Sequence, residues 1–578
     1  MVNVKNLFGM AVMATALVGC SSNDNLAPDG KDNVGKAGTA YAKFTIQLPT
    51  TNGTRTVDPN TGADFNGGTA HEYAVKDAQL VIFEKPDASK GEGDYKFVET
   101  VPIGNLEPWN NQTTANQGVT RYADITAKLE HVDITDSGDK YYALIILNNG
   151  GESKVKLPTS GTYSAWNVAE NAKSAADFLS TSDGFYMSNA PLLKSGAPQT
   201  LVPIKGVYST KAEAQNKPAT TVYVERGMAK VTIGSTSFAS KPVDATSSTI
   251  YDGDKVQIKE WTLDVMNQKT FPVHTTTGLT DKFTTIWSAD RFHAGADPQR
   301  VYWGTDPNYN MTSLSDVDAC KDEFYLLDRD GNTYNGVTES TATWSDQTKP
   351  LYCLENTFDI DNMKQGQTTR VVFKATYTPV AVASETDKTF FMIGNNPKIW
   401  TMTTLKQQIT NKVQELLKST SVSVTINDGA DLLKAGSHKV TAADITITGT
   451  TTTTTLNYDE LNTKLGLDNT PGIKTYKNGE CYYIARIKHF NELTPWPSIS
   501  GSRETYGINN DANNALFLGR YGVLRNNWYD LEVTKFSAPG YPDVPVVNPT
   551  DPDDEDTKFI NVEVKILDWA KRSQSIEL

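Results

Sequence analysis

Ala42-Lys43-Phe44-Thr45-Ile46-Gln47-Leu48 alternates apolar and polar side chains at every position, and Pro49 follows directly. Successive side chains of an extended chain point to opposite faces, so this period of two predicts a β-strand with one buried face. We expect Pro49 to end the strand, because proline has no backbone N–H for a sheet ladder. A strand of this kind is typical of a half-buried sheet, and it sets the fold class that the rest of the chain extends.

Further apolar runs bounded by turn-forming residues predict more strands along the chain. They lie at residues 78–83, 140–149, 184–190, 222–233, 261–267, 370–377 and 482–487. Two helices are expected between them. One covers Ala165 to Leu179, and the other contains Leu405, Ile409 and Val413 at helical spacing after Thr403 or Thr404 as its N-cap. The pattern therefore predicts an all-β fold of sandwich strands with a few helical insertions.

Length and charge limit the number of domains and the kinds of partner. A chain of 578 residues predicts two or three domains, and we place a boundary near Ser235, where a loop rich in Ser, Pro and Asp begins. The formal charge is −14, from 54 Lys and Arg against 68 Asp and Glu, with no basic cluster to neutralise phosphates. Nucleic acid is therefore not expected as a partner.

The N-terminus carries an export signal. Lys5 precedes the apolar run 7–18, which is too short to span a bilayer and ends at Gly19-Cys20. Small residues directly before a cysteine resemble the bacterial lipobox, so we expect residues 1–19 to be a lipoprotein signal peptide and Cys20 to be lipidated. An ordinary secretion signal with an accidental cysteine is the alternative. A polar tether follows, so the membrane is expected as a partner only through this lipid anchor.

A turn-rich segment follows the first strand. Residues 50–62 are dense in Thr, Asn, Gly, Asp and Pro, and Arg55 is their only basic residue. Such a segment is accessible to proteases, so we predict a cleavage site at Arg55, with Thr56 as the new N-terminus.

The C-terminus ends in an isolated strand pattern. Residues 541–557 form a Pro/Asp linker that we expect to be extended and solvated, and residues 558–578 follow it. Within that last segment the apolar residues Ile560, Val562, Val564 and Ile566 alternate with polar ones, and Trp569 comes next. A strand beyond such a linker has no expected place in its own sheet and is typical of a segment that pairs with another chain.

No catalytic or cofactor motif stands out. The six histidines form no His-Glu-x-x-His pattern, and the phosphate-binding loop and the Gly-x-Ser-x-Gly elbow are absent. Ser137 to Lys140 fits a Ser-x-x-Lys pattern, and Asp328 to Asn332 resembles part of a Ca²⁺ loop, but turns explain both segments. We therefore expect no enzyme, no catalytic residue, no cofactor and no metal. After lipidation of Cys20, the remaining Cys320, Cys353 and Cys481 allow one disulfide or three free thiols.

Several segments together resemble a known family. Residues 141–148, 185–189 and 224–230 look like the N-terminal domain of Bacteroidetes fimbrillins, while residues 351–356, 481–487 and 522–529 look like the C-terminal domain of the Mfa type. The order of these pieces, spanning nearly the whole chain behind a lipobox, is similar to that of the shaft subunit of minor fimbriae, a type V pilin. The stretch around residues 403–467 is longer than in that family.

The resemblance implies a fold and an assembly mechanism. It implies two transthyretin-like β-sandwich domains, over residues 56–235 and 236–540, preceded by a propeptide over residues 20–55. The strand with Ala42, Phe44, Ile46 and Leu48 would be removed by cleavage after Arg55. The strand with Ile560, Val562, Val564, Ile566 and Trp569 would be the donor that fills the groove of a neighbouring copy.

Partners and location follow from the same resemblance. It implies a cell-surface fimbria built from copies of this chain, with accessory anchor and tip pilins, a precursor in the outer membrane and a role in adhesion and biofilm formation. An arginine-specific or trypsin-like protease would process the chain, and host or bacterial surface receptors would be its targets. The alternative function is a surface glycan-binding β-sandwich lipoprotein, which the ten tryptophans allow.

Overall fold

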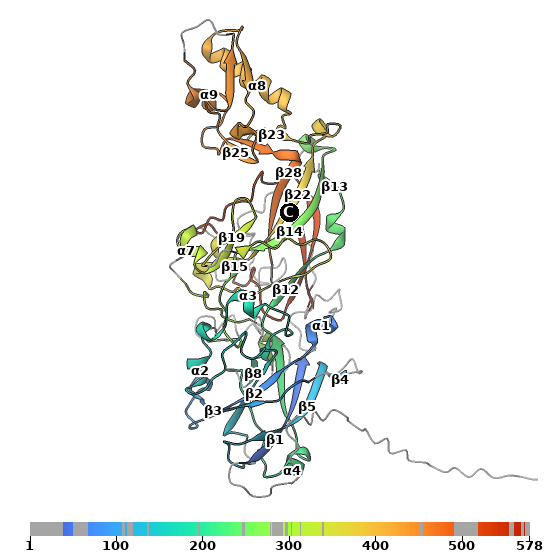
Figure 1. Cartoon of the computed structure of the whole chain (residues 1–578), viewed down its shortest axis with the longest axis vertical. Coiled ribbons are helices and arrows are strands. Elements are labelled where there is room, and N and C mark those ends of the chain that lie inside the picture. Colours follow the sequence, from blue (N-terminus) through green and yellow to red (C-terminus); the bar gives the residue numbers. More distant parts are fainter. Residues whose placement is uncertain are drawn as a thin grey trace, which may run out of the picture.

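The protein consists mostly of strands, arranged in a computed structural model as two sandwiches in a row with a smaller module at one end (Figure 1). The structure describes residues 39–49, 68–106, 110–111, 119–135, 138–194, 197–244, 249–277, 279, 293–294, 299–301, 303–311, 314–337, 340–449, 455–489, 518–553, 560–567 and 571–572. The predicted all-β class with a few helical insertions is confirmed.

The first sandwich is built around nine strands. Eight of them follow each other in the order β3-β2-β6-β7-β11-β1-β5-β4, and the ninth, β10, pairs with β6. Strand β11 joins two sheets, because its first half pairs with β1 and its second half with β7. Apolar side chains from both sheets form one core. The strands are β1 (Ala40–Pro49), β2 (Ala78–Glu84), β3 (Lys96–Pro102), β4 (Asn110–Asn111), β5 (Val119–Leu129), β6 (Tyr141–Leu147), β7 (Met187–Asn189), β10 (Val202–Pro203) and β11 (Thr220–Arg226).

The second sandwich packs a sheet of order β21-β12-β29-β30-β31 against a sheet of order β13-β14-β22-β28. Its core takes side chains from β12 and β29 on one side and from β14, β22 and β28 on the other, which is the face-to-face packing of a sandwich. The strands are β12 (Ala229–Ile233), β13 (Lys241–Pro242), β14 (Lys255–Asp264), β21 (Leu351–Cys353), β22 (Arg370–Thr378), β28 (Glu480–Arg486), β29 (Trp528–Phe536), β30 (Ile560–Leu567) and β31 (Lys571–Arg572).

The change from one sandwich to the other comes earlier than the expected boundary near Ser235. Strand β11 ends at Arg226 in the first sandwich, and β12 begins at Ala229 in the second, so only Gly227 and Met228 separate them. A Cβ at Gly227 would come within 2.9 Å of the rings of Phe178 and Tyr186, so this close turn requires glycine. The single apolar run at residues 222–233 is therefore two strands that belong to different domains.

A tip module is inserted between β22 and β28 of the second sandwich (Figure 1). It consists of α8 (Met402–Leu417), α9 (Tyr458–Lys464) and the strands β23 (Phe390–Ile393), β24 (Ser423–Ile426), β25 (Gly436–His438), β26 (Ile445–Thr448) and β27 (Ile473–Tyr476), and it has a core of its own. The predicted helix is confirmed, with Leu405, Ile409 and Val413 buried, but its N-cap is Thr401.

The helix expected from Ala165 to Leu179 is wrong. The segment folds as three short pieces, α2 (Tyr163–Trp166), a 3₁₀ turn (Ala169–Asn171) and α3 (Ala175–Phe178). Polar side chains interrupt it, because Asn171 Nδ2 donates to the carbonyl of Trp166 at 2.6 Å and Ser174 Oγ caps a new helix start. The other short helices are α1 (Ala70–Tyr73), α4 (Lys211–Gln215) and α7 (Val317–Lys321).

Two small sheets accompany the sandwiches, and the first of them contains strands from both halves of the chain. Strands β8 (Leu192–Lys194) and β9 (Ala197–Gln199) form a sheet with β16 (His293–Ala294) and β17 (Gln299–Val301). Strands β15 (Met266–Asn267), β18 (Phe324–Leu327), β19 (Thr333–Asn335) and β20 (Ser340–Thr341) form another, and the turn at 328–332 joins β18 to β19. Within the described residues, no helix combines the length and the apolar character needed to cross a membrane.

Candidate assembly site

The first strand lies in the middle of the first sandwich. Strand β1 pairs antiparallel with β5, from Ala40 opposite Leu129 to Leu48 opposite Arg121. Its other edge pairs parallel with β11, where Phe44 lies opposite Thr220. A ladder along the whole strand with β5 and a four-residue ladder with β11 therefore hold β1, and removal of this strand would leave a slot between β5 and β11.

The side chains of β1 alternate between core and surface as the sequence predicts. Ala42, Phe44 and Ile46 are fully buried and Leu48 is 3% exposed, all within the core of the first sandwich. The buried Phe, Ile and Leu side chains contribute about 2 kcal/mol each by the hydrophobic effect. On the outward face Thr45 Oγ1 donates to Asp124 Oδ1 at 2.6 Å. The slot left by β1 would thus be apolar along its floor.

The predicted processing residues lie outside the described residues. Cys20 precedes residue 39, and Arg55 and Thr56 fall between β1 and the next described residue, Gly68. This segment connects β1 to the rest of the first sandwich, so a cut there removes the covalent link between the strand and its domain. Cleavage at Arg55 therefore stays a prediction, and it would free β1 to leave the position between β5 and β11.

The last strand has a place in its own domain, contrary to our expectation. Strand β30 pairs antiparallel with β29, with Val564 opposite Leu531 and Val562 opposite Val533. Within the residues that the structure describes, its other edge pairs with the two-residue β31 alone. Strand β29 would otherwise be an open edge with unpaired backbone groups, and β30 satisfies them. Trp569 lies outside the described residues.

The expected solvated linker is wrong as well. Residues 538–553, here called the C-terminal arm, lie along the second sandwich. Backbone bonds of 2.8 Å in both directions join Tyr541 to Tyr482, and Arg370 Nη2 donates to the carbonyl of Pro545 at 2.6 Å. Val544 is buried. The Pro/Asp composition concealed the reason, which is that the arm also carries an apolar surface: Pro542, Val544, Pro545, Val547 and Pro549 are buried.

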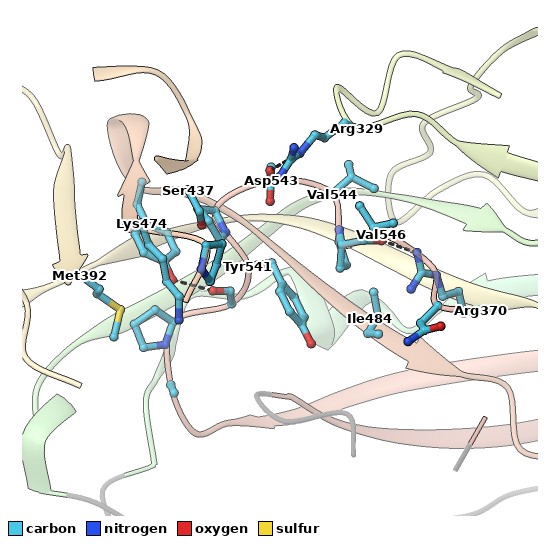
Figure 2. Close-up of a pocket in the computed structure, with 18 of the residues that line it drawn as sticks. Arg329, Arg370, Met392, Ser437, Lys474, Ile484, Tyr541, Asp543, Val544 and Val546 are labelled. Atoms are coloured by element: carbon cyan, nitrogen blue, oxygen red, sulfur yellow. Dashed lines mark hydrogen bonds and ion pairs between the residues drawn. The ribbon is translucent and has the colours of Figure 1, made fainter. Parts of the chain in front are cut away.

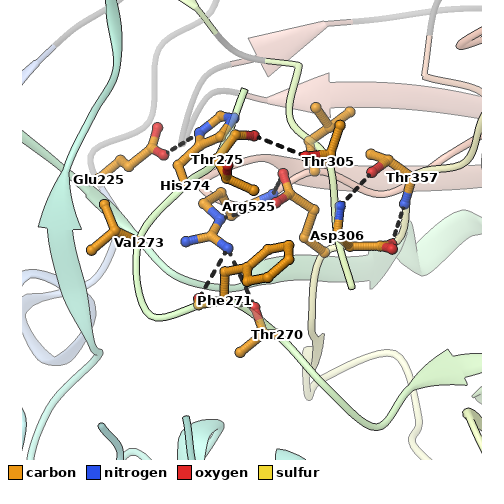
Figure 3. A network of polar contacts seen from close by, with 12 residues as sticks. Glu225, Thr270, Phe271, Val273, His274, Thr275, Thr305, Asp306, Thr357 and Arg525 are labelled. Carbon is orange, nitrogen blue, oxygen red and sulfur yellow. Dashed lines mark hydrogen bonds and ion pairs between the residues drawn. The ribbon is translucent and has the colours of Figure 1, made fainter. Parts of the chain in front are cut away.

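A buried polar network lies where the two sandwiches meet, and one of its contacts bridges them (Figure 3). Glu225 on β11 lies 2.6 Å from Nδ1 of His274 through its Oε1. Nearby, within the second half of the chain, Nε of Arg525 lies 3.1 Å from Glu355 Oε2, and Nη2 of Arg525 donates to Thr270 Oγ1 at 3.3 Å. All five residues are buried. Separation of the sandwiches would take the buried Glu225 away from His274, so this contact favours the joined arrangement.

A second buried pair lies at the same junction. Lys230 Nζ on β12 is 2.7 Å from Oε1 of Glu72 in α1, Tyr352 Oη donates to that carboxylate at 2.9 Å, and Arg226 Nε donates to the carbonyl of Glu72. Burial alone would raise the pKa of Glu72, but the bond from Lys230 and its charge outweigh burial and hold this pKa below its usual range. Charged residues inside the strand pattern at 224–230 are a sign of these buried contacts in the sequence, and our predictions did not use it.

The cysteines and acidic clusters add no further site to this region. Cys320, Cys353 and Cys481 are buried free thiols. Within the residues that the structure describes, no group of three His, Cys, Asp or Glu side chains is placed to hold a metal ion.

Comparison with known proteins gives one family match. Residues 502–575 match the C-terminal domain of the type IV major fimbrial subunit protein, fimbrillin. The match confirms the resemblance to fimbrillins and is consistent with the Mfa type. It includes β29, β30 and the C-terminal arm, the elements that hold the last strand. No curated protein sequence matches the chain.

The search of solved structures found matches that include three fimbrial proteins. The fimbrilin FimA of Porphyromonas gingivalis W83 is 10% identical, with a TM-score of 0.37 over 93% of this chain and 97% of that one. The tip fimbrial protein Mfa3 of Porphyromonas gingivalis, with a C-terminal truncation, is 10% identical with a TM-score of 0.27 over 92% and 100%. A fimbrial assembly protein of Parabacteroides distasonis ATCC 8503 is 10% identical with a TM-score of 0.25 over 59% and 96%.

Proposed function

We propose, for a chain whose residues 502–575 belong to the fimbrillin family of fimbrial subunits, that it polymerises by strand exchange. The precursor is exported as a lipoprotein acylated at Cys20 and is then cleaved after Arg55. Release of β1 opens the slot between β5 and β11. The C-terminal strand of a neighbouring copy leaves its own β29 and fills that slot, and repetition builds a fibre.

The observation that supports this mechanism is the difference in backbone pairing between the two strands. Strand β1 pairs along its whole length with β5 and over residues 44–47 with β11, and it has a buried apolar face, whereas β30 pairs along its length with β29 and over only two residues with β31. A strand that moves from an edge position into a two-sided slot gains a second ladder, at about 1 kcal/mol for each hydrogen bond. The transfer of β30 is therefore favourable once the slot is empty.

Cleavage acts as the switch because the tethered first strand competes with the donor. A strand on its own short tether has an effective concentration in the millimolar range, whereas a free neighbour is present at about micromolar concentration. This difference disfavours exchange by about 4 kcal/mol. Proteolysis removes that advantage, so uncleaved chains stay monomeric.

The same mechanism places the subunit in a cell-surface fimbria. Copies of the chain would form the shaft, accessory anchor and tip pilins would complete it, and the fibre would support adhesion to surface receptors and biofilm formation. Because assembly needs only backbone pairing and apolar burial, the chain is a structural protein and no catalytic residue is assigned to it.

Removal of the C-terminal strand tests the proposal. A chain that lacks residues 559–578 should be exported, folded and cleavable, because β29 keeps β12 as a partner. It should not form fibres, and electron microscopy together with a gel run without boiling would detect any polymer. Fibres built from the truncated chain, or a truncated chain that fails to fold, would overturn the proposed role of this strand.

Processing is tested at Arg55. Fibre subunits should begin at Thr56 by N-terminal sequencing, and an Arg55→Ala chain should remain monomeric with β1 attached. Arg55→Lys distinguishes the protease, since a trypsin-like enzyme still cuts it and an arginine-specific enzyme does not. A mature fibre subunit that still contains residues 40–48 would contradict the proposal.

A further inference from the structure

A cleft of about 460 Å³ lies where the tip module, the second sandwich and the C-terminal arm meet (Figure 2). One wall is the small sheet of the tip module, in the order β23-β27-β25. The outer side of β22 and β28 forms the opposite wall, and residues 538–548 of the arm complete the enclosure. This volume matches a monosaccharide or a molecule of similar size.

The tip-module wall presents a lysine in the centre of a row. Lys474 on β27 lies opposite Met392 on β23 and opposite Ser437 on β25, and all three line the cleft. Residues directly opposite on neighbouring strands share a face, so the register itself turns this row toward the cavity. Lys474 is half-buried, and within the described part of the chain its ammonium has no ion pair or hydrogen bond. Burial lowers the pKa of Lys474, as expected for a charge without a partner.

The sandwich wall is cationic too. Arg370 and Arg486 lie directly opposite each other on β22 and β28, and both are buried. Asp264 neutralises Arg370, with Nη2 of the arginine 2.7 Å from Oδ2 of the aspartate. Two like charges in this position destabilise a sheet unless negative charge lies nearby. The Arg370 charge is thus compensated by Asp264, and Asp553 lies close enough to Arg486 to stabilise its charge, so the attraction for a negatively charged ligand comes mainly from Lys474.

The acidic side chains of the cleft do not balance these cations. Four cationic and two acidic side chains line it, and one of the acidic residues, Asp543, already accepts from Arg329 Nε at 2.8 Å. The other, Asp551, accepts from Asn548 Nδ2 at 2.6 Å. The unpaired charge is thus positive and is centred on Lys474.

The arm supplies a flat, weakly polar surface. Tyr541, Pro539 and Pro542 line the cleft, and Tyr476 Oη donates to the carbonyl of Gly540 at 2.8 Å, which fixes the arm over the cavity. Rings of this kind pack against the C–H face of a sugar, while amide side chains in the lining, such as Asn395, can bind hydroxyl groups.

We propose that this cleft binds an acidic monosaccharide, a uronic or sialic acid, with the carboxylate on the Lys474 ammonium and the ring against Tyr541. The site does not depend on the proposed polymerisation, but one consequence does. The arm leads to the C-terminal strand, so we expect a strand that leaves β29 to loosen the arm, and a bound sugar to favour the docked state. By linkage, a bound sugar stabilises the docked arm by the same free energy by which docking of the arm strengthens sugar binding.

Titration of the purified precursor, followed by calorimetry, tests the site directly. Glucuronate and N-acetylneuraminate are the probes, glucose is the neutral control, and acetate is the control for charge alone. Binding of at least one acidic sugar, tighter than glucose and acetate, supports the proposal. Absence of binding at millimolar concentrations, or equal binding of glucose, overturns it, and equal binding of acetate reduces the site to a simple anion site and overturns the sugar assignment.

Two lysine variants locate the ligand. Lys474→Met keeps the length of the side chain and should weaken binding about 10- to 100-fold, the effect of losing one charge-assisted hydrogen bond. Lys406→Met removes an exposed charge from α8, outside the cleft, and should bind like the parent chain. Unchanged binding by Lys474→Met, in a variant that melts at the parent temperature, would overturn the assignment.

Hydrogen exchange of residues 538–553 then measures the coupling. A saturating acidic sugar should slow exchange in the arm and delay fibre formation after cleavage, and Lys474→Met should show neither effect. A sugar that binds without protecting the arm would contradict the coupling but leave the site intact. Normal fibre formation by a chain that binds no sugar would refute only the site, so failure of the two proposals can be told apart.

Discussion

Phe44→Ala should speed the loss of the first strand after cleavage by two or more orders of magnitude. Phe44 is fully buried in the core of the first sandwich, and a buried Phe→Ala change costs about 3–5 kcal/mol. In the cleaved chain β1 is held without a covalent link, so this cost appears as weaker binding of the released segment. At about 1.4 kcal/mol for each factor of ten, the segment should bind roughly 100- to 4,000-fold more weakly.

The assay measures the release of the cut N-terminal segment, not the unfolding of the domain. The purified precursor is cleaved at Arg55, and size-exclusion chromatography with mass spectrometry measures how fast the N-terminal fragment dissociates. Fibre formation should start correspondingly earlier, because an empty slot is what the donor strand requires. Lys43→Ala is the matched control, since Lys43 is the preceding residue on the outward face of β1 and donates to the carbonyl of Gln215 at 3.2 Å.

The reasoning would be refuted by equal dissociation of the Phe44→Ala and parent fragments. An equal acceleration by Lys43→Ala would also refute it, because the buried face of β1 would then not determine its retention. The uncleaved Phe44→Ala chain should still be a folded monomer, since the tether keeps β1 at high effective concentration.

Other perturbations test the remaining elements. Val564→Asp should reduce fibre formation strongly, since a carboxylate in an apolar slot costs several kcal/mol, whereas the neighbouring Glu563→Gln should assemble normally; equal behaviour of the two variants in a sedimentation assay would refute the register. Cys20→Ala should leave an unacylated precursor, and normal palmitate labelling of that variant would show that another residue is lipidated. Burial raises the pKa of Asp306 to about 7 despite its bonds to Asn267 and Thr357, so the folded state retains a proton that the unfolded state releases near pH 4. The stability contributed by protonated Asp306 is complete below pH 4 and is lost as the pH rises to 7. Asp306→Asn should therefore reduce the difference in melting temperature between pH 5 and pH 8. An unchanged difference would contradict the raised pKa of Asp306.

Local periodicity predicted individual strands well, because burial of one face leaves a direct trace in the sequence. The alternation from Ala42 to Leu48 gave both the strand and its buried face, and Leu405, Ile409 and Val413 gave the buried side of α8. The boundary between the sandwiches left no such trace. Strand-forming residues run through β11 and β12 with only Gly227 and Met228 between them, and it is the packing in the fold that shows that the two strands enter different cores.

Features that depend on distant segments could not be predicted. The C-terminal arm has the composition of a linker, and only its contacts with Tyr482 and Arg370 show that it is docked. Lys474 belongs to an ordinary strand pattern, and its position in a cleft results from three segments that meet only in the folded chain. The spacing of apolar residues along the sequence does not show which distant segments come together in the folded chain.

The direct succession of β11 and β12 has a mechanical consequence for a fibre. In a fibre assembled by the proposed strand exchange, tension would enter one subunit through the strand seated beside β11 and leave through the C-terminal arm. Between these points the force runs along β11, through Gly227 and Met228, into β12, and from there into β29 through their parallel ladder. A ladder pulled along its strands shares the force among all its hydrogen bonds, so it resists far better than one that opens bond by bond. The tip module lies off this path, so a pulled fibre would stretch without deforming it.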